Sequence, residues 1–231
     1  MSHNHHQIKH IFFDLDHTLW DFDKNSELAF AQIFQQQNIN INIQTFIDIY
    51  IPINHACWKL YENNQISSED LRLMRLKQTF QNLSYDISEA NLSKIADEYI
   101  ALLPEFNHLF ENTIDVLEYL SQKYTLHLIT NGFTDVQHKK INNANLTHFF
   151  KTFTNAEIAG EKKPHQQIFQ HALSLAQAHK AESIMIGDSM HADVQGALDF
   201  GIKALFFNHN DKEKIHNYQQ ITHLKELKTL F

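Results

Sequence analysis

The 231-residue chain is long enough for one large domain or for a core domain with an insert, and its 43% apolar and 20% charged residues exclude an intrinsically disordered protein. A formal net charge of -8 argues against binding to nucleic acid or anionic membranes, which depends on clustered lysine and arginine. The single cysteine, Cys57, permits no internal disulfide, and no apolar run reaches the ~18 residues that a transmembrane helix needs, so we expect a cytoplasmic protein.

The first predicted element is a strand over residues 8–13, a short apolar run that fits a strand buried on both faces of a parallel sheet. Asp14 and Asp16 follow it, and two residues at this spacing in an extended chain point to the same side. An isolated Asp-x-Asp is more often a turn after a strand. A buried pair of carboxylates, however, must be ion-paired, protonated or metal-bound.

Residues 21–105 show helical rather than strand periodicity and predict a small bundle of four amphipathic helices inserted into the core. The first helix carries Phe30, Ile33 and Phe34, and the second spans residues 53–61. The glutamine- and asparagine-rich residues 35–44 between them are expected to form the end of the first helix and a polar loop. The third and fourth begin at N-caps Ser67, with Asp70 completing a capping box, and Ser88. The predicted core domain is therefore residues 1–20 and 106–231.

After residue 106, strand-like and helix-like segments alternate, which predicts βαβ units, a parallel sheet and an α/β fold. Predicted strands cover residues 126–129, about 152–153, 183–186 and 202–207, and predicted helices include residues 136–144, a helix opened by Pro164, a helix ended by Gly201, and a closing helix with Leu224, Leu227 and Leu230. Polar turns follow three of the strands. In a right-handed parallel sheet these turns lie along one edge.

The polar residues expected at that edge are Asp14, Asp16, Thr130, Asn131, Lys163, Asp188 and Asp193. Four carboxylates near one ammonium repel each other, so the cluster calls for a cation, and all-oxygen ligands favour Mg²⁺. Such a site suits a phosphate group: Asp14 can attack the phosphorus, and Asp16 can protonate the leaving oxygen and later take a proton from water. Thr130 and nearby backbone N–H groups can bind the phosphate oxygens, Lys163 can offset their charge, and Asp188 can complete the metal shell.

The motifs Asp14-Leu15-Asp16-His17-Thr18-Leu19, Thr130-Asn131-Gly132, Lys163-Pro164 and Gly187-Asp188-Ser189-Met190-His191-Ala192-Asp193 occur in this order over nearly the whole chain. They resemble the haloacid dehalogenase-like hydrolase superfamily. This resemblance implies a Rossmann-like core with a helical cap of the type found in phosphoglycolate phosphatase and its relatives. It also implies that Asp14 is the nucleophile, that Asp16 is the acid and base, and that Asp14, the Asp16 carbonyl and Asp188 hold Mg²⁺. Asp193 would support the metal site indirectly, by orienting a metal-bound water or Lys163.

A narrower resemblance is to the pyrimidine 5′-nucleotidase branch, carried by Phe133 after Gly132 and by Asn54, Trp58, Tyr61 and Arg75. It implies a nucleoside 5′-monophosphate substrate bound in part by Trp58, Tyr61 and Arg75. The competing interpretation is that the two aromatic residues are bundle core and that Arg75 is a solvated surface residue. His165 stands where the family usually has an acidic residue or asparagine, which bears on helix capping more than on chemistry.

The core motifs are also compatible with other functions. A phosphatase of phosphoglycolate or a sugar phosphate, or a phosphomutase, would keep every core motif. A dehalogenase would not need Asp16, and a phospho-accepting signalling domain would have its motifs in a different order and no such helical insert. We expect a small phosphate ester as the partner, with no nucleic acid polymer and no membrane. The sequence does not decide between a monomer and a homodimer.

Overall fold

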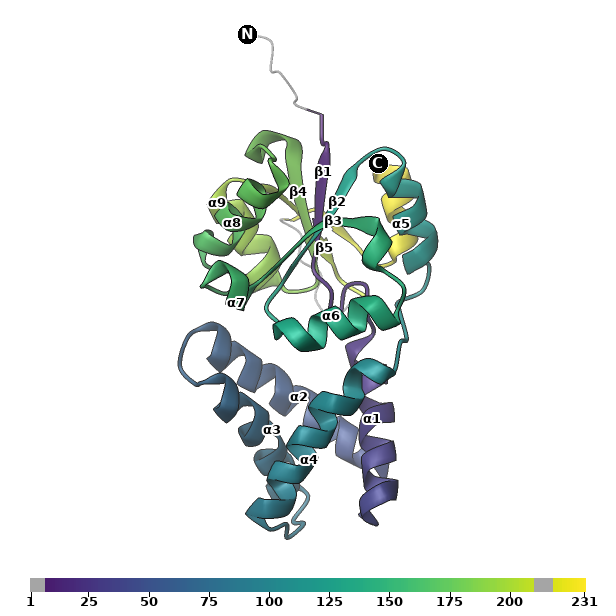
Figure 1. Cartoon of the computed structure of the whole chain (residues 1–231), viewed down its shortest axis with the longest axis vertical. Coiled ribbons are helices and arrows are strands. Elements are labelled where there is room, and N and C mark those ends of the chain that lie inside the picture. The colour runs from purple at the N-terminus through teal and green to yellow at the C-terminus, as the bar shows by residue number, and fades with distance from the viewer. Residues whose placement is uncertain (1–6, 210–217) are drawn as a thin grey trace. The chain divides into compact units, whose positions relative to one another are not determined.

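The computed structural model describes residues 7–209 and 218–231, which form two compact units. One unit comprises the described residues up to Asp21 together with His108–Phe231, and the other is Phe22–Asn107. The first unit contains the sheet and the second is helical (Figure 1). In the described residues, no helix is both long and apolar enough to span a membrane. The sequence-based domain boundaries, and a cap role for the helical unit, stay predictions.

The sheet of the first unit has six parallel strands in the order β3-β2-β1-β4-β5-β6. The strands are β1 (His10–Phe13), β2 (Thr125–Thr130), β3 (Phe150–Asn155), β4 (Ser183–Gly187), β5 (Lys203–Phe207) and β6 (Gln220–Ile221). Strand β1 lies between β2 and β4, and its Ile11, Phe12 and Phe13 are fully buried. The predicted α/β fold with a parallel sheet is confirmed, and the polar turns after β1, β2 and β4 lie side by side.

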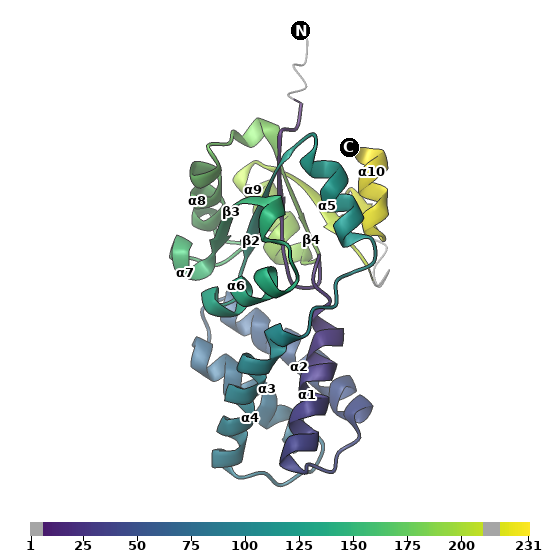
Figure 2. The same cartoon turned by 45° about the vertical axis from the view of Figure 1, so that its right-hand side comes forward.

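Helices cover both faces of this sheet. They are α5 (Thr113–Ser121), α6 (Thr134–Asn143), α7 (Ala156–Ala159), α8 (Gln166–Ala176), α9 (Gly196–Phe200) and α10 (Leu227–Leu230). Figures 1 and 2 show α8 and α9 on one face, α5 and α10 on the other, and α6 beyond the carboxyl ends of the strands. Phe12 and Met185 of the sheet pack with Ile168 and Phe169 of α8 in one buried cluster. This core fixes the edge from which the polar turns emerge.

The start of α8 differs from the sequence-based expectation. The helix begins at Gln166 rather than at Pro164, with His165 as its N-cap. The His165 imidazole accepts a hydrogen bond from the Gln167 amide at 3.2 Å, so the capping role expected for this position is confirmed. Pro164 instead lies in the turn after Lys163, where it ends the preceding loop. Gly201 caps α9 in the left-handed conformation (φ 92°), as predicted.

The helical unit is built from α1 (Phe22–Gln37), α2 (Ile43–Glu62), α3 (Ser68–Asn82) and α4 (Glu89–Leu102). The second helix begins at Ile43, earlier than predicted, because Asn42 caps it through the Thr45 amide and its first turns also carry a buried apolar stripe. The unit has an aromatic core in which Phe30 stacks on Tyr99 with ring centroids 4.3 Å apart. The capping box of Ser67 and Asp70 forms as expected.

Candidate active site

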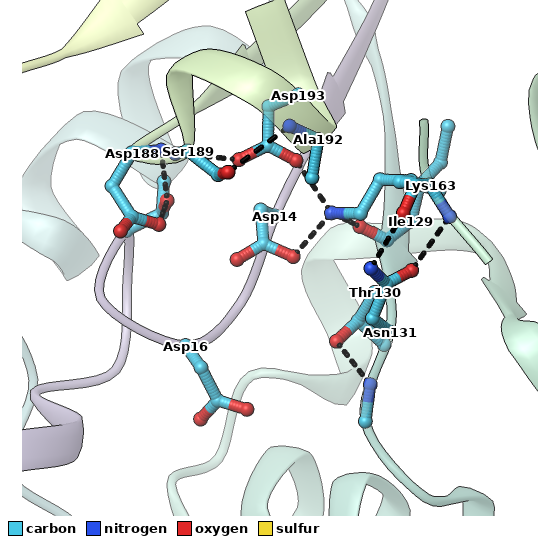
Figure 3. Close-up of polar contacts among 12 residues, drawn as sticks. Asp14, Asp16, Ile129, Thr130, Asn131, Lys163, Asp188, Ser189, Ala192 and Asp193 are labelled. Carbon is cyan, nitrogen blue, oxygen red and sulfur yellow. Dashed lines mark hydrogen bonds and ion pairs between the residues drawn. The ribbon is translucent and has the colours of Figure 1, made fainter. Parts of the chain in front are cut away.

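Lys163 lies at the centre of a buried polar network at the carboxyl ends of the strands (Figure 3). Its Nζ donates to Asp14 Oδ1 and Asp193 Oδ1, each at 2.6 Å, and to the Ile129 carbonyl at 2.8 Å. The side chains of Lys163, Asp193 and Asp14 are 3%, 2% and 11% exposed, so both ion pairs are shielded from water. Loss of either partner of a shielded ion pair leaves the other charge uncompensated.

The ionisation of this network depends on burial as well as on charge. Burial raises the pKa of Asp14 to about 7, with Asp193 and Asp16 adding to the rise and Lys163 opposing it. Burial by itself would lower the pKa of Lys163, but the Asp14 and Asp193 carboxylates raise it above its ordinary value. Lys163 is therefore protonated and lies beside the Asp14 carboxyl group, whose ionisation is disfavoured by burial.

Asn131 holds the loop that carries Lys163. This residue follows β2 directly, its Oδ1 accepts from the Lys163 backbone N–H at 2.8 Å, and its Nδ2 donates to the Lys163 carbonyl at 3.0 Å. The two bonds tie a loop between α7 and α8 to the end of β2. The amide side chain thus sets where the Lys163 ammonium can lie.

Asp188 follows β4 and is bound to the turn after β1 through Thr18. The Thr18 hydroxyl donates to Asp188 Oδ1 at 3.2 Å and accepts from the Asp188 backbone N–H at 3.1 Å. Burial raises the pKa of Asp188 well above its ordinary value, and the Asp14 and Asp193 carboxylates raise it further. Within the described residues, no cation forms an ion pair with this carboxylate. Asp188 is therefore the carboxylate in the cluster most in need of a positive partner.

Asp193 lies in the short π-helix Met190–Gln195 after β4, and its side chain folds back over Gly187. Its Oδ2 accepts from the Ser189 backbone N–H at 3.0 Å, while its Oδ1 receives Lys163. A Cβ at Gly187 would overlap the Asp193 carboxylate, so the glycine of this motif is needed for close approach rather than for an unusual backbone angle.

Asp16 lies apart from the Lys163 network, with its carboxylate directed away from Asp14 (Figure 3). It is bound by helix α6: Lys140 Nζ donates to Asp16 Oδ1 at 2.6 Å, and Gln137 Nε2 donates to Asp16 Oδ2 at 2.9 Å. Gln137 Nε2 also donates to the Thr130 hydroxyl at 2.7 Å. These contacts join the turn after β1 to the end of β2.

Among the described residues of the unit that contains the sheet, two groups of side chains could hold a metal ion. One carboxylate oxygen each from Asp14, Asp188 and Asp193 lie within 4.8 Å of one another. Ligand atoms of His17, Asp188 and His209 also lie within 4.8 Å of one another. Asp188 belongs to both groups.

Of the seven residues expected at this edge, the structure brings together Asp14, Thr130, Asn131, Lys163, Asp188 and Asp193. The expectation that the Asp14 and Asp16 carboxylates point to the same side is wrong, because β1 ends at Phe13 and the chain turns instead of continuing as a strand. Gly132 lies beside Thr130, whose hydroxyl accepts from the Gly132 backbone N–H at 3.2 Å. Sequence reasoning missed Thr18, Gln137 and Lys140. The sequence does contain an indication for Gln137 and Lys140: they are three residues apart in a predicted helix, on the same face as the buried Ile141. Buried polar residues on an apolar helical face call for nearby partners.

In the helical unit, Arg75 is 3% exposed, which contradicts its interpretation as a solvated surface residue. Its Nη1 donates to Asn54 Oδ1 at 2.9 Å, and its guanidinium lies 5.0 Å from the centre of the Tyr99 ring. Its buried Nε has no hydrogen-bond partner among the residues that the structure describes. Trp58 and Tyr61 are half-buried and pack edge to face, with ring centroids 5.6 Å apart.

Comparison with known proteins places this chain among hydrolases. Residues 8–201 match the family model described as haloacid dehalogenase-like hydrolase. The chain is 30% identical to pyrimidine 5′-nucleotidase PynA of Streptococcus pneumoniae, covering 93% of this chain and 90% of that protein. It is also 30% identical to a glyceraldehyde 3-phosphate phosphatase of Pyrococcus abyssi, covering 87% and 82%. The crystal structure of putative HAD-hydrolase YfnB from Bacillus subtilis, bound to magnesium, superposes with a TM-score of 0.86 at 25% identity over 97% of this chain and 98% of that one.

Proposed function

Because the chain belongs to the haloacid dehalogenase-like hydrolase family, we propose that it is a Mg²⁺-dependent phosphate monoester hydrolase that acts on nucleoside 5′-monophosphates. The observation that carries the proposal is the pairing of Asp14 with Lys163 at 2.6 Å, close to the Asp188 carboxylate, which has no ion-pair partner among the described residues. A nucleophilic oxygen, a fixed cation and an acidic metal site then lie together at the switch point of a parallel sheet.

The residues present fit a hard divalent cation. Burial raises the pKa values of both Asp14 and Asp188, repulsion from neighbouring carboxylates raises them further, and a cation between the two would favour both ionised forms. We assign Asp14, Asp188 and the Asp16 main-chain carbonyl as Mg²⁺ ligands. Asp193 supports the site indirectly, since its two oxygens already accept from Lys163 and Ser189. Bound Mg²⁺ would neutralise charge on the phosphate oxygens during transfer.

In the first half-reaction, an Asp14 carboxylate oxygen attacks phosphorus and forms the aspartyl phosphate while the bond from phosphorus to the ester oxygen breaks. Asp16 gives its proton to the departing oxygen, which leaves as an alcohol. Lys163 offsets the negative charge of the phosphoryl oxygens. The Thr130 hydroxyl and the backbone N–H groups of Asn131 and Gly132 bind those oxygens.

In the second half-reaction, water attacks the phosphorus of the aspartyl phosphate and Asp16 takes the proton that the water loses. The bond between phosphorus and the Asp14 oxygen breaks, which releases inorganic phosphate and restores the carboxylate. Asp193 keeps Lys163 in place through both steps by accepting a hydrogen bond from its ammonium. A phosphomutase would differ only in the acceptor, a sugar hydroxyl in place of water.

The nucleotide part of the proposal is supported by the similarity to PynA over nearly the full length of both chains. We include Trp58, Tyr61 and Arg75 as the residues that bind the nucleoside. Aromatic rings can stack on a base, and the buried guanidinium of Arg75 suits a base carbonyl because it lacks a carboxylate partner within the described residues. The glyceraldehyde 3-phosphate phosphatase relative supports a second candidate substrate, a small sugar phosphate.

A two-stage assay tests these assignments. Phosphate release from an aryl phosphate, with and without EDTA, tests the mechanism, and activity that survives chelation or persists in Asp14→Asn contradicts it. A panel of nucleoside monophosphates, triose and sugar phosphates and phosphoglycolate at equal Mg²⁺ then tests the substrate. A higher kcat/KM for any non-nucleotide ester than for every nucleotide would replace the nucleotide assignment and leave the chemistry intact.

A further inference from the structure

Helix α6 carries two buried side chains that contact both oxygens of Asp16. Lys140 Nζ donates to Oδ1 at 2.6 Å and Gln137 Nε2 donates to Oδ2 at 2.9 Å. Lys140 and Gln137 are 2% and 1% exposed, whereas the Asp16 side chain is 20% exposed. The most accessible member of this trio is therefore the carboxylate, and the two donors reach it from the protein interior.

The position of Lys140 is restrained from a second side. Its Nζ lies 4.2 Å from the centre of the Trp20 ring, and Trp20 is itself fully buried. A cation over an aromatic face is attracted to the ring electrons. Asp16 and Trp20 both belong to the segment that follows β1, so Lys140 fixes the two ends of that segment relative to α6.

Gln137 links Asp16 to the end of β2. The same Nε2 that donates to Asp16 donates to the Thr130 hydroxyl at 2.7 Å. The Gln137 Oε1 is buried and has no hydrogen-bond partner in the described part of the chain, and a flip of the amide would turn this oxygen toward the Asp16 carboxylate. A buried amide oxygen without a partner is unfavourable. An apolar residue at position 137 would avoid that cost. We therefore attribute the presence of glutamine to the hydrogen bonds that its Nε2 donates.

Gly132 makes room for this arrangement. A Cβ built on Gly132 would overlap the Nε2 and Cδ of Gln137. Gly132 does not have a positive φ, so its backbone conformation is open to other residues. The glycine in Thr-Asn-Gly is therefore required because Gln137 crosses it on the way to Thr130 and Asp16.

We propose that Gln137 and Lys140 are positioning residues, which hold the Asp16 carboxyl group in the orientation that proton transfer to the leaving oxygen requires. The inference rests on the proposed function, in which Asp16 is the acid and base. In the proposed mechanism neither side chain bonds to phosphorus or gives a proton to the ester oxygen. Their effect passes through Asp16, because a proton-transfer group acts only within hydrogen-bond reach of its target.

The test compares two leaving groups in the first turnover, measured by rapid mixing. The alkoxide of a nucleoside 5′-monophosphate needs a proton to leave, whereas the phenolate of p-nitrophenyl phosphate leaves without one. Lys140→Met should slow the first turnover of the nucleotide about 30-fold and that of the aryl phosphate less than about threefold. Gln137→Met should also slow the nucleotide more than the aryl phosphate, with an added loss on both esters because Thr130 loses a hydrogen-bond donor. Lys139→Met, a change at the adjacent exposed lysine of the same helix, should alter neither rate.

Two further variants distinguish a positioning effect on the rate from a loss of rate caused by unfolding. Gly132→Ala retains both donors but displaces Gln137, and it should reproduce the leaving-group selectivity of Gln137→Met. Adding Lys140→Met to Asp16→Asn should cause no further loss on the nucleotide, since the group that Lys140 positions is already inactive. Thermal unfolding of each variant accompanies the rates.

If a folded variant loses the same factor in first-turnover rate on both esters, the positioning role is wrong. It is also wrong if the rate loss of the double variant is the product of the losses of the two single variants. Either result would leave the proposed function standing, because wild-type phosphate release would be unaffected. A wild type that releases no phosphate from any ester in Mg²⁺ would instead overturn the proposed function and this inference with it.

Discussion

Thr18 and Asp188 exchange two hydrogen bonds: the hydroxyl donates to the carboxylate at 3.2 Å and accepts from the backbone N–H at 3.1 Å. This exchange joins the turn after β1 to the turn after β4 and orients a proposed metal ligand. Partners of metal ligands affect affinity even without touching the metal.

Thr18→Val should therefore weaken Mg²⁺ binding about 10-fold, because the Asp188 carboxylate loses its donor while the side-chain shape is kept. Titration of Mg²⁺ by calorimetry checks this without using activity. Thr18→Ser retains the hydroxyl and should bind within about twofold of the wild type. Equal affinity of the valine variant and the wild type would contradict the assignment of Asp188 as a ligand.

Mg²⁺ should raise the thermal stability of the wild type, since the ion binds the folded state and relieves repulsion between Asp14 and Asp188. At a concentration 100 times the dissociation constant, the expected gain is about 2.7 kcal/mol. Asp188→Asn should lose this gain and be no less stable than the wild type in EDTA, because it removes a partly buried carboxyl group whose ionised form is disfavoured. Scanning calorimetry with and without EDTA measures both effects. A metal-dependent gain that persists in the variant would place the ion elsewhere.

Lys163→Met should abolish most activity and also destabilise the fold. The change leaves the buried carboxylates of Asp14 and Asp193 without their cation, at a cost of about 3 kcal/mol. We expect kcat to fall at least about 100-fold, as for loss of a group that stabilises developing charge. Urea unfolding at pH 7 and steady-state kinetics test the two parts separately. Unchanged stability would mean that the ion pairs are not maintained in solution.

Arg75→Met should raise KM for nucleotides about 10-fold with little effect on small sugar phosphates, since the guanidinium is proposed to contact the nucleoside. The variant should also lose about 1–3 kcal/mol of stability, because buried Asn54 loses a hydrogen-bond donor and Tyr99 loses its contact with the guanidinium, and urea unfolding measures this loss separately from the kinetics. Arg72→Met on the same helix is the matched control, since Arg72 is partly exposed and pairs with Asp97 at 2.7 Å. The same rise in KM for sugar phosphates would count against a role in binding the nucleoside.

His127 should make the protein less stable in acid. Burial, with a contribution from His10, lowers the pKa of His127 from 6.5 to about 4, so between these values the unfolded chain binds more protons than the folded one. The free energy of unfolding should therefore fall as pH drops from 6.5 toward 4, by at most about 3 kcal/mol. Urea unfolding of the wild type and His127→Gln at pH 7 and pH 4.5 should show a smaller acid-induced loss in the variant. Parallel pH profiles would contradict the prediction.

Much of the fold and the core of the candidate site follows from sequence periodicity. A short apolar run ending in Asp14 and another ending in Gly187 and Asp188 predict buried parallel strands, and the carboxyl ends of such strands share an edge. Thr130 and Lys163 were predicted at that edge on the same grounds. The capping residues Ser67 and Gly201 were also predictable, because caps depend on local backbone geometry.

Only the tertiary structure decided which side chains meet. Periodicity shows that one face of α6 is buried, but the contacts of Gln137 and Lys140 with Asp16 depend on where the helix packs beyond the sheet. Arg75 likewise reads as a surface residue from its charge, and packing of four helices buries it. Local sequence specifies the conformation and polarity of each element, whereas contacts across more than 100 residues depend on the packing of all elements together.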